Sequence, residues 1–157
     1  MVRFKNRYLV VQMETVDEKT GIIDYAPSAS ESAPTSSTLA TQLRALLQAN
    51  FGDHAASLAS QSFSVKYCNA ITGLFILRVA REQLSTIWMT ISLAGSARMI
   101  MRMVHVAGTI RSAQRAAMKY ATKKMETKMK LCSSKDERNK MKQMIEASHK
   151  AIKAINA

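Results

Sequence analysis

The pattern of hydrophobic and polar positions predicts two strands joined by a short turn in the middle of the chain. In the first of them every second residue is apolar, which is typical of a strand with one buried face: Phe63, Val65 and Tyr67. Residues 74–80 form an almost unbroken apolar run, as expected for a central strand covered on both faces. Asn69 and Gly73 bracket the link, and both tolerate the positive φ angles of tight connections. We expect the rest of the chain to pack on this hairpin.

Two more strands and two helices are predicted around the hairpin. Residues 2–13 form the first strand, and residues 99–106 form the fourth. A helix capped by Thr38 and ended by Gly52 carries leucines along one face: Leu39, Leu43, Leu46 and Leu47. A second helix, which ends near Gly95, carries a similar apolar stripe: Leu84, Ile87, Trp88 and Ile91.

The order of these elements, β-α-β-β-α-β, predicts an α+β fold of the ferredoxin-like (RRM-like) type. This α/β sandwich has a four-stranded antiparallel sheet with two helices on one face, and here extra C-terminal helices follow. The third helix spans about residues 108–130. A capping box of Ser134 and Glu137 opens the fourth, whose stripe needs a partner surface in this chain or another: Met141, Met144, Ile145, Ser148, Ile152 and Ile155.

The predicted organisation is a single domain over residues 1–132, followed by a basic helical extension over residues 133–157. Residues 17–38 are rich in Ser, Ala, Thr and Pro without periodicity, so we expect an inserted flexible loop there. No apolar run approaches the ~20 residues of a membrane span, and the basic N-terminus lacks the apolar core of a signal. Cys68 and Cys132 lie far apart without a C-x-x-C pattern, so we expect reduced thiols in a soluble intracellular protein.

The net charge of the chain limits the possible functions more than its length does. The 157 residues include 23 Lys and Arg against 11 Asp and Glu, a net charge of +12. Such an excess most often serves a polyanion, with nucleic acid ahead of an anionic membrane. The basic residues gather at the two ends of the chain, so we expect the ends rather than the middle to bind. Three of them share one side of the first strand, either as phosphate contacts or as a solubilising edge: Arg3, Lys5 and Arg7.

The third helix carries a basic stripe that repeats every four residues: Arg111, Arg115, Lys119 and Lys123. The stripe is about 18 Å long at 1.5 Å per residue, enough to follow several phosphates. Another face is small, which allows close approach to the sheet: Ile110, Ala113, Ala117 and Ala121. Gly108 and Thr109 precede the helix, where free N–H groups and the positive dipole end suit an anion. The alternatives are a solvated basic face and an ordinary threonine cap.

No catalytic set assembles from the sequence. His54, His105 and His149 have no metal-ligand spacing among themselves or with the cysteines, so we predict no metal site. We find no Gly-rich phosphate loop, no nucleophile elbow and no pair of carboxylates on one element. The aromatic strand of an RNA-recognition motif is also missing, so contacts to RNA shape and phosphates are favoured over base stacking.

Three stretches together resemble a known family: MVRFKNRYL at 1–9, YCNAITG at 67–73 with Leu77 and Arg78, and HVAGTIRSAQ at 105–114. They are similar to the processing-of-precursor protein five family, the smaller α/β protein subunit of eukaryotic ribonuclease P and ribonuclease MRP. The second stretch resembles the family's N-A-x-T-G-x-x-x-L-R, and the third resembles H-V-G-G-T-I-R-x-x-Q with Ala107 in place of the first glycine. The resemblance covers residues 1–13 and about 39–125, without the insertion and the basic tail.

The resemblance implies a non-catalytic, RNA-binding subunit of a nuclear and nucleolar ribonucleoprotein. The RNA would be the catalyst and would hold the divalent metal (Mg²⁺), so the protein itself would bind no cofactor. The protein would brace this RNA and pair with a TIM-barrel-like protein subunit. The substrates would be precursor tRNA, cut at its 5′ leader, and precursor rRNA. The alternative is a protein-interaction or RNA-assembly module without a role in tRNA processing, whose charge only solubilises it.

The central hairpin adds a docking prediction. Lys66 and Arg78 flank it and extend a basic surface, so we predict that both contact RNA. We favour the link as a docking point for the partner over a purely structural turn, through three residues: Asn69, Thr72 and Gly73.

Overall fold

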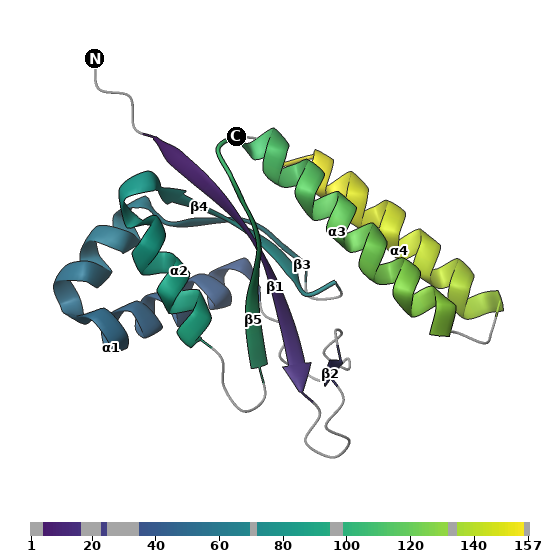
Figure 1. Cartoon of the computed structure of the whole chain (residues 1–157), viewed down its shortest axis with the longest axis horizontal. Helices are drawn as coiled ribbons and strands as arrows, with labels where there is room; N and C mark the ends of the chain where they lie inside the picture. Colours follow the sequence, from purple (N-terminus) through teal and green to yellow (C-terminus); the bar gives the residue numbers. More distant parts are fainter. Residues whose placement is uncertain are drawn as a thin grey trace.

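The computed structural model describes residues 5–16, 23–24, 35–69, 72–94, 99–131 and 135–155. Its strands and helices follow the predicted order, with a short extra strand after the first (Figure 1). The strands are β1 (Asn6–Val16), β2 (Ile23–Asp24), β3 (Ser64–Asn69), β4 (Leu74–Ala80) and β5 (Met99–Ala107). The helices are α1 (Ser36–Ser62), the 3₁₀ turn η1 (Arg81–Gln83), α2 (Leu84–Leu93), α3 (Ile110–Leu131) and α4 (Lys135–Lys153).

The sheet has the strand order β3-β4-β1-β5, and each neighbouring pair is antiparallel. The two-residue β2 pairs with the end of β1 at Thr15 and Val16. This order, with two strands from each half of the chain interleaved, confirms the ferredoxin-like α+β fold with a four-stranded antiparallel core and added C-terminal helices. The chain start at residues 1–4 and most of the predicted loop at 17–38 lie outside the described residues.

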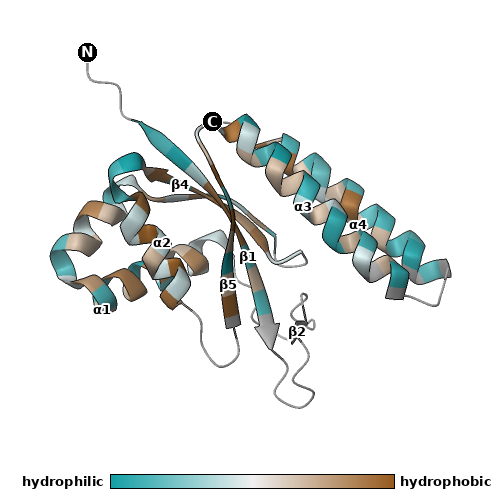
Figure 2. Ribbon diagram, viewed as in Figure 1, coloured by the Kyte–Doolittle hydropathy of each residue, from teal (hydrophilic) through white to brown (hydrophobic). Residues whose placement is uncertain are grey.

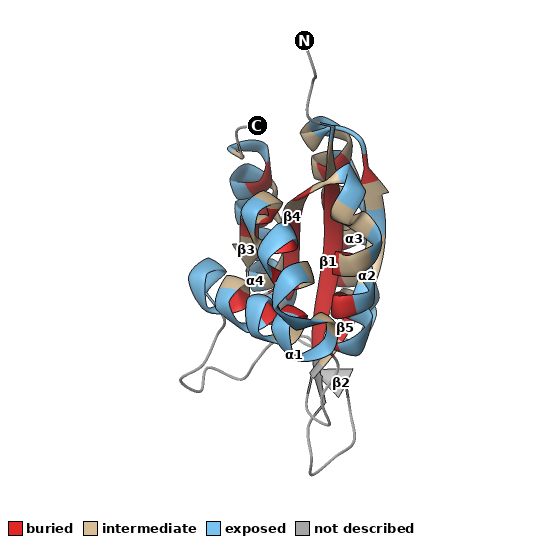
Figure 3. Ribbon diagram, turned by 90° about the vertical axis from the view of Figure 1, so that its left-hand side faces the viewer, coloured by how far each residue is buried: buried red, intermediate tan, exposed pale blue. Residues whose placement is uncertain are grey.

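The sheet is the middle layer of three. Helices α1 and α2 cover one face and helices α3 and α4 cover the other, while β1 runs buried between them (Figures 1 and 3). The two faces are apolar where they meet the helices, and the outward faces of α3 and α4 are hydrophilic (Figure 2). Among the described residues, no helix combines the length and the apolar character needed to cross a membrane.

Alternation along β1 and β4 explains why the sheet needs both layers. Five side chains of these strands pack in the core under α1 and α2: Leu9, Val11, Phe75, Leu77 and Val79. Their sequence neighbours point the other way, into the core under α3: Tyr8, Val10, Leu74 and Ile76. The prediction of a central strand covered on both faces is therefore confirmed for β4.

Two bulges were not predicted from the sequence. In β3, Val65 pairs with Leu77 but Tyr67 pairs with Ile76, so one extra residue, Lys66, lies between them. The extra residue turns the strand over: Val65 packs against the α1 and α2 core, whereas Tyr67 belongs to the core under α3. The prediction that Phe63, Val65 and Tyr67 share one face is therefore wrong, because a one-residue shift reverses every later side chain. A similar shift in β5 lies opposite Val10 and Val11.

Helix α1 begins earlier and runs further than predicted. Thr35, not Thr38, is the N-cap, and its hydroxyl accepts a hydrogen bond from the Thr38 amide at 3.2 Å. Gly52 does break the helix, with φ 75° and ψ 175°, but a second helical stretch continues to Ser62. The leucine stripe is confirmed, since Leu39, Leu43 and Leu47 are buried and Leu46 is partly buried. Trp88 of α2 departs from its predicted stripe, because it is 44% exposed.

Helix α4 finds its partner surface within the chain. Ile152 is fully buried in the core under α3, and the Ser148 hydroxyl lies 3.2 Å from the Tyr67 hydroxyl. From α3, the Gln114 side chain donates to the carbonyls of Ile152 and Ile155 at 2.9 and 3.0 Å. Met144 is the exception in the predicted stripe, being 40% exposed. Ser134 of the predicted capping box lies outside the described residues, and the boundary at residue 132 stays a prediction.

Candidate nucleic-acid interface

The basic stripe of α3 lies on the side of the helix that faces away from the sheet. Ala113, Ala117 and Ala121 are buried against the sheet, as predicted. A step of two residues turns an α-helix by about 200°, so side chains two positions along point outward. The stripe residues are accordingly all exposed: Arg111, Arg115, Lys119 and Lys123. Because Gln114 and Thr122 bind α4 from a third side, α4 does not cover the stripe.

The start of α3 lies beside the start of β1. Tyr8 pairs with Ala107, so the basic N-terminal end of the chain is adjacent to the turn that leads into α3. A Cβ atom at Gly108 would lie 3.9 Å from the Arg7 guanidinium, which places these two predicted residues together. The Thr109 hydroxyl accepts a hydrogen bond from the Ser112 amide at 3.3 Å. Thr109 is thus a helix cap, and the positive end of the helix faces the same region as Arg7.

An open groove of about 1050 Å³ lies at this end of the sheet, between the end of α1 and the turn η1. Three basic side chains line it: Lys5, Arg78 and Arg81. The Arg81 amide donates a hydrogen bond to the Lys5 carbonyl at 2.8 Å, which fixes these two residues next to each other. Arg81 was not predicted as a site residue from the sequence. The one sequence feature that could have indicated it is its position directly after β4, which carries Arg78 near its end.

The remaining basic residues predicted to contact RNA are placed less completely. Lys66 is half-buried at the bulge of β3, on the outer strand of the sheet. Arg3 lies outside the described residues. The structure therefore brings Lys5 and Arg78 together in the groove and Arg7 to the start of α3, while the far end of the stripe, Lys123, lies about 18 Å along the helix.

The link between β3 and β4 is hydrogen-bonded to β1. The Met13 amide donates to the Gly73 carbonyl at 2.7 Å, and the buried Gln12 side chain donates to the Thr72 carbonyl at 3.1 Å. Thr72 is 6% exposed, and its amide faces the Asn69 side-chain oxygen at 3.4 Å. The three predicted docking residues thus have contacts within the chain, and their docking role stays a prediction.

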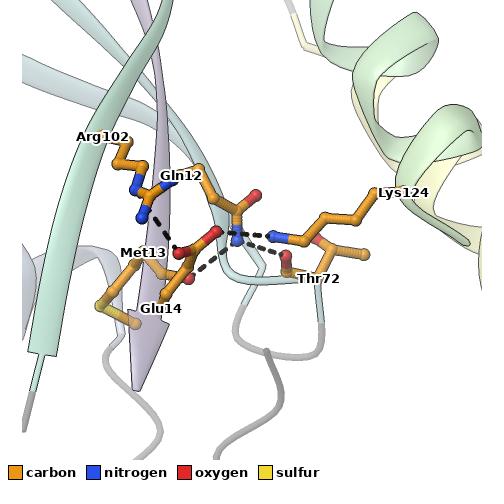
Figure 4. A network of polar contacts seen from close by, with 6 residues as sticks. All are labelled: Gln12, Met13, Glu14, Thr72, Arg102 and Lys124. Carbon is orange, nitrogen blue, oxygen red and sulfur yellow. Dashed lines mark hydrogen bonds and ion pairs between the residues drawn. The ribbon is translucent and has the colours of Figure 1, made fainter. Parts of the chain in front are cut away.

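A buried polar network joins this link to α3 (Figure 4). Glu14 of β1 is 3% exposed, and its carboxylate lies 3.3 Å from Lys124 of α3 and 3.6 Å from Arg102 of β5. Gln12 lies beside it and is fully buried. A buried carboxylate is costly unless it is paired. The network therefore holds α3 in register on the sheet through a charge pair that sequence reasoning did not find.

Among the described residues, no group of three or more His, Cys, Asp or Glu is placed to hold a metal ion. His54 and His105 are exposed on different elements, and the His149 ring lies 3.1 Å from the Thr122 hydroxyl. Burial raises the pKa of the Cys68 thiol. The described chain thus offers cationic surfaces and a groove as its candidate functional features.

Comparison with known proteins decides the family. The family model described as "Rpp14/Pop5 family" matches residues 7–118, which is most of the chain and includes β1, the hairpin and the first part of α3. The chain belongs to the Rpp14/Pop5 family. The match contains the groove residues Arg78 and Arg81 and the first two residues of the basic stripe, Arg111 and Arg115; Lys119 and Lys123 lie just beyond it.

Curated members of the Rpp14/Pop5 family resemble the chain over most of their length. The "Ribonuclease P/MRP protein subunit POP5" of Schizosaccharomyces pombe is 36% identical over 121 residues, covering 75% of this chain and 86% of the relative. The "Probable ribonuclease P/MRP protein subunit POP5" of Arabidopsis thaliana is 30% identical over 139 residues, covering 87% and 89%. A chain of the structure titled "Cryo-EM structure of yeast Ribonuclease MRP" aligns with a TM-score of 0.49 at 12% identity, over 84% of this chain and 99% of that chain. That likeness adds nothing to the family assignment.

Proposed function

We propose that this Rpp14/Pop5 family member is a protein subunit of the ribonuclease P and MRP ribonucleoproteins. The observation that carries the proposal is the family match across most of the chain, with relatives that bear this name in several kingdoms. A protein-interaction module outside RNA processing is not favoured, because it leaves both the family match and the net charge of +12 without a role.

The subunit's part in the particle is to bind RNA and support the RNA's own catalysis. The exposed stripe of α3 meets phosphates along one RNA segment, and Arg7, Gly108 and Thr109 add a contact at the helix start. Catalysis and the divalent metal belong to the RNA in this proposal. A TIM-barrel-like subunit is the protein partner, precursor tRNA and precursor rRNA are the substrates, and the nucleus and nucleolus are the site of action.

Depletion of the protein in its own cells tests the proposal. Precursor tRNAs should accumulate with uncut 5′ leaders. A second copy of the gene that the depletion does not target should restore processing. Normal tRNA maturation after near-complete depletion would sink the proposal.

The phosphate contacts of α3 can be tested on the purified chain. Single alanine substitutions on the stripe should each lower the slope of log K for RNA binding against log salt, by roughly one unit per lost phosphate contact: Arg111→Ala, Arg115→Ala and Lys119→Ala. Stability should stay within about 0.5 kcal/mol, because exposed charges contribute little to folding. A matched triple variant on α4 removes the same charge from another exposed surface: Lys142→Ala, Lys150→Ala and Lys153→Ala. Equal losses for both triple variants would mean that total charge, not the stripe, governs binding.

A further inference from the structure

The middle of the sequence has few basic residues, and two of them lie together in the groove. Among the described residues from β2 to α2, the basic residues are Arg44, Lys66, Arg78 and Arg81. Arg78 and Arg81 line the groove, and the Arg44 guanidinium lies 5.6 Å from the centre of the Phe63 ring, which also lines it. Lys5 joins them from the start of β1, 73 or more residues away in sequence from both groove arginines. Three cations from two distant stretches therefore line one groove.

The groove has a mixed lining that suits a nucleotide. Glu82 is the acidic residue of its lining, so the cations outweigh it. Leu58 presents an apolar wall and is 45% exposed, while Asn6 offers an amide. Bases need apolar surface and polar edges together, and the phosphates that follow them need cations. A purely solubilising set of charges would not converge on an exposed leucine.

From this arrangement we infer that the groove binds an unpaired segment of RNA. The inference rests on the proposed function, and it adds a second RNA site with its own ligand class. A volume of about 1050 Å³ lies at the upper end of the range for small-ligand pockets. Such a pocket holds one or a few splayed nucleotides, whereas the convex face of α3 suits the backbone of a duplex.

The groove and the start of the stripe lie near the same end of the sheet, on different elements. The groove is lined by the end of α1, the turn η1 and the ends of β1, β3 and β4, whereas the stripe faces outward from α3. The subunit would join two RNA segments, a paired one along α3 and an unpaired one in the groove.

Binding of the purified full chain to two RNA probes tests the inference. One probe is a single-stranded oligouridylate of about ten nucleotides, within the usual site size of single-strand binders. The other is an RNA duplex of about 16 base pairs, the length that spans two minor grooves. Fluorescence anisotropy over a salt series gives the affinity and the salt slope for each probe. Urea unfolding of every variant checks that it is folded.

Variants of the groove should separate the two probes. Arg81→Ala should weaken oligouridylate binding about tenfold, the scale of a hydrogen bond to a charged group, and lower its salt slope by about 0.7. Duplex binding should stay within about twofold. Arg81→Ala keeps the backbone hydrogen bond to Lys5, so the fold of the groove is preserved. Glu82→Gln should strengthen oligouridylate binding, because it removes the groove's carboxylate.

Lys142→Ala on α4 is the matched control, since it removes one exposed positive charge far from the groove in sequence. The inference is overturned if the wild-type chain binds the duplex but not oligouridylate. It is also overturned if Arg81→Ala weakens oligouridylate binding no more than Lys142→Ala does. An acidic segment of a partner protein would then be the better occupant. If wild type binds neither probe, the proposed RNA-binding function itself fails.

Discussion

Gly73 is the position where one added methyl group should do the most damage. Its φ of 64° lies in the left-handed region, and an added Cβ would overlap the Met13 carbonyl oxygen and lie 2.7 Å from the Gln12 amide nitrogen. The Met13 carbonyl belongs to β1, which is held on both edges by β4 and β5. It cannot move aside as the end of a flexible side chain can. The hairpin must therefore lift away from β1 in Gly73→Ala.

The cost of Gly73→Ala can be built from its parts. A left-handed conformation costs a non-glycine residue about 1–2 kcal/mol. Lifting the hairpin breaks the hydrogen bond from Met13 to Gly73, worth about 1 kcal/mol, and leaves the buried Gln12 amide short of an acceptor for about 1–3 kcal/mol more. We therefore expect Gly73→Ala to lower the free energy of unfolding by about 3–6 kcal/mol, a large share of a typical domain's stability.

Two other glycines supply the controls. Gly52 also has a positive φ, 75°, and its ψ of 175° puts it in a region that almost only glycine adopts. Nothing lies within 4 Å of its added Cβ, so Gly52→Ala should show backbone strain alone, at about 1–3 kcal/mol. Gly108→Ala meets only Arg7 at 3.9 Å and should change stability by about 0.5 kcal/mol or less. Urea unfolding followed by circular dichroism measures all three variants. If Gly73→Ala loses no more stability than Gly52→Ala, the close packing of the hairpin on β1 is refuted.

Three further predictions follow from the described contacts. Asn69→Ala and Thr72→Ala should each leave stability within about 1 kcal/mol and yet weaken binding of the TIM-barrel-like subunit in a pull-down titration; unchanged binding would return the link to a structural turn. Lys124→Met should cost about 2–4 kcal/mol in urea unfolding, because it strips Glu14 of its nearest cation; a loss under about 0.5 kcal/mol would contradict the buried pair. Since burial raises the pKa of Cys68, alkylation of this thiol should begin at higher pH in the folded chain than in urea, as mass spectrometry of its peptide can show; equal profiles would contradict its burial.

Local patterns predicted the fold because each element carried its own signal. The leucine spacing of α1, the apolar run of β4 and the four-residue spacing of α3 each arise within a single element. The short side chains of Ala113, Ala117 and Ala121 even predicted which face of α3 meets the sheet. The order of elements then limited the topology to very few choices.

What the sequence could not predict depends on contacts between distant residues. The bulge at Lys66 reverses Tyr67, and nothing in the local alternation marks it. Thr35 and Thr38 are equal as candidate caps until the helix start is known. The groove joins Lys5 to Arg81, and both come together only through the antiparallel pairing of β1 with β4. The spacing of residues along the chain cannot predict such a site, because only the fold brings its residues together.

The central claim is that this chain is a subunit of ribonuclease P and MRP that contacts their RNA. The most direct measurement is to tag the native protein in its own cells, purify it under mild salt and sequence the RNA that remains bound. The account predicts strong enrichment of the ribonuclease P or MRP RNA over a tagged control protein, and loss of that enrichment in the triple variant of Arg111, Arg115 and Lys119. Recovery of the intact protein without enrichment of either RNA would contradict the account.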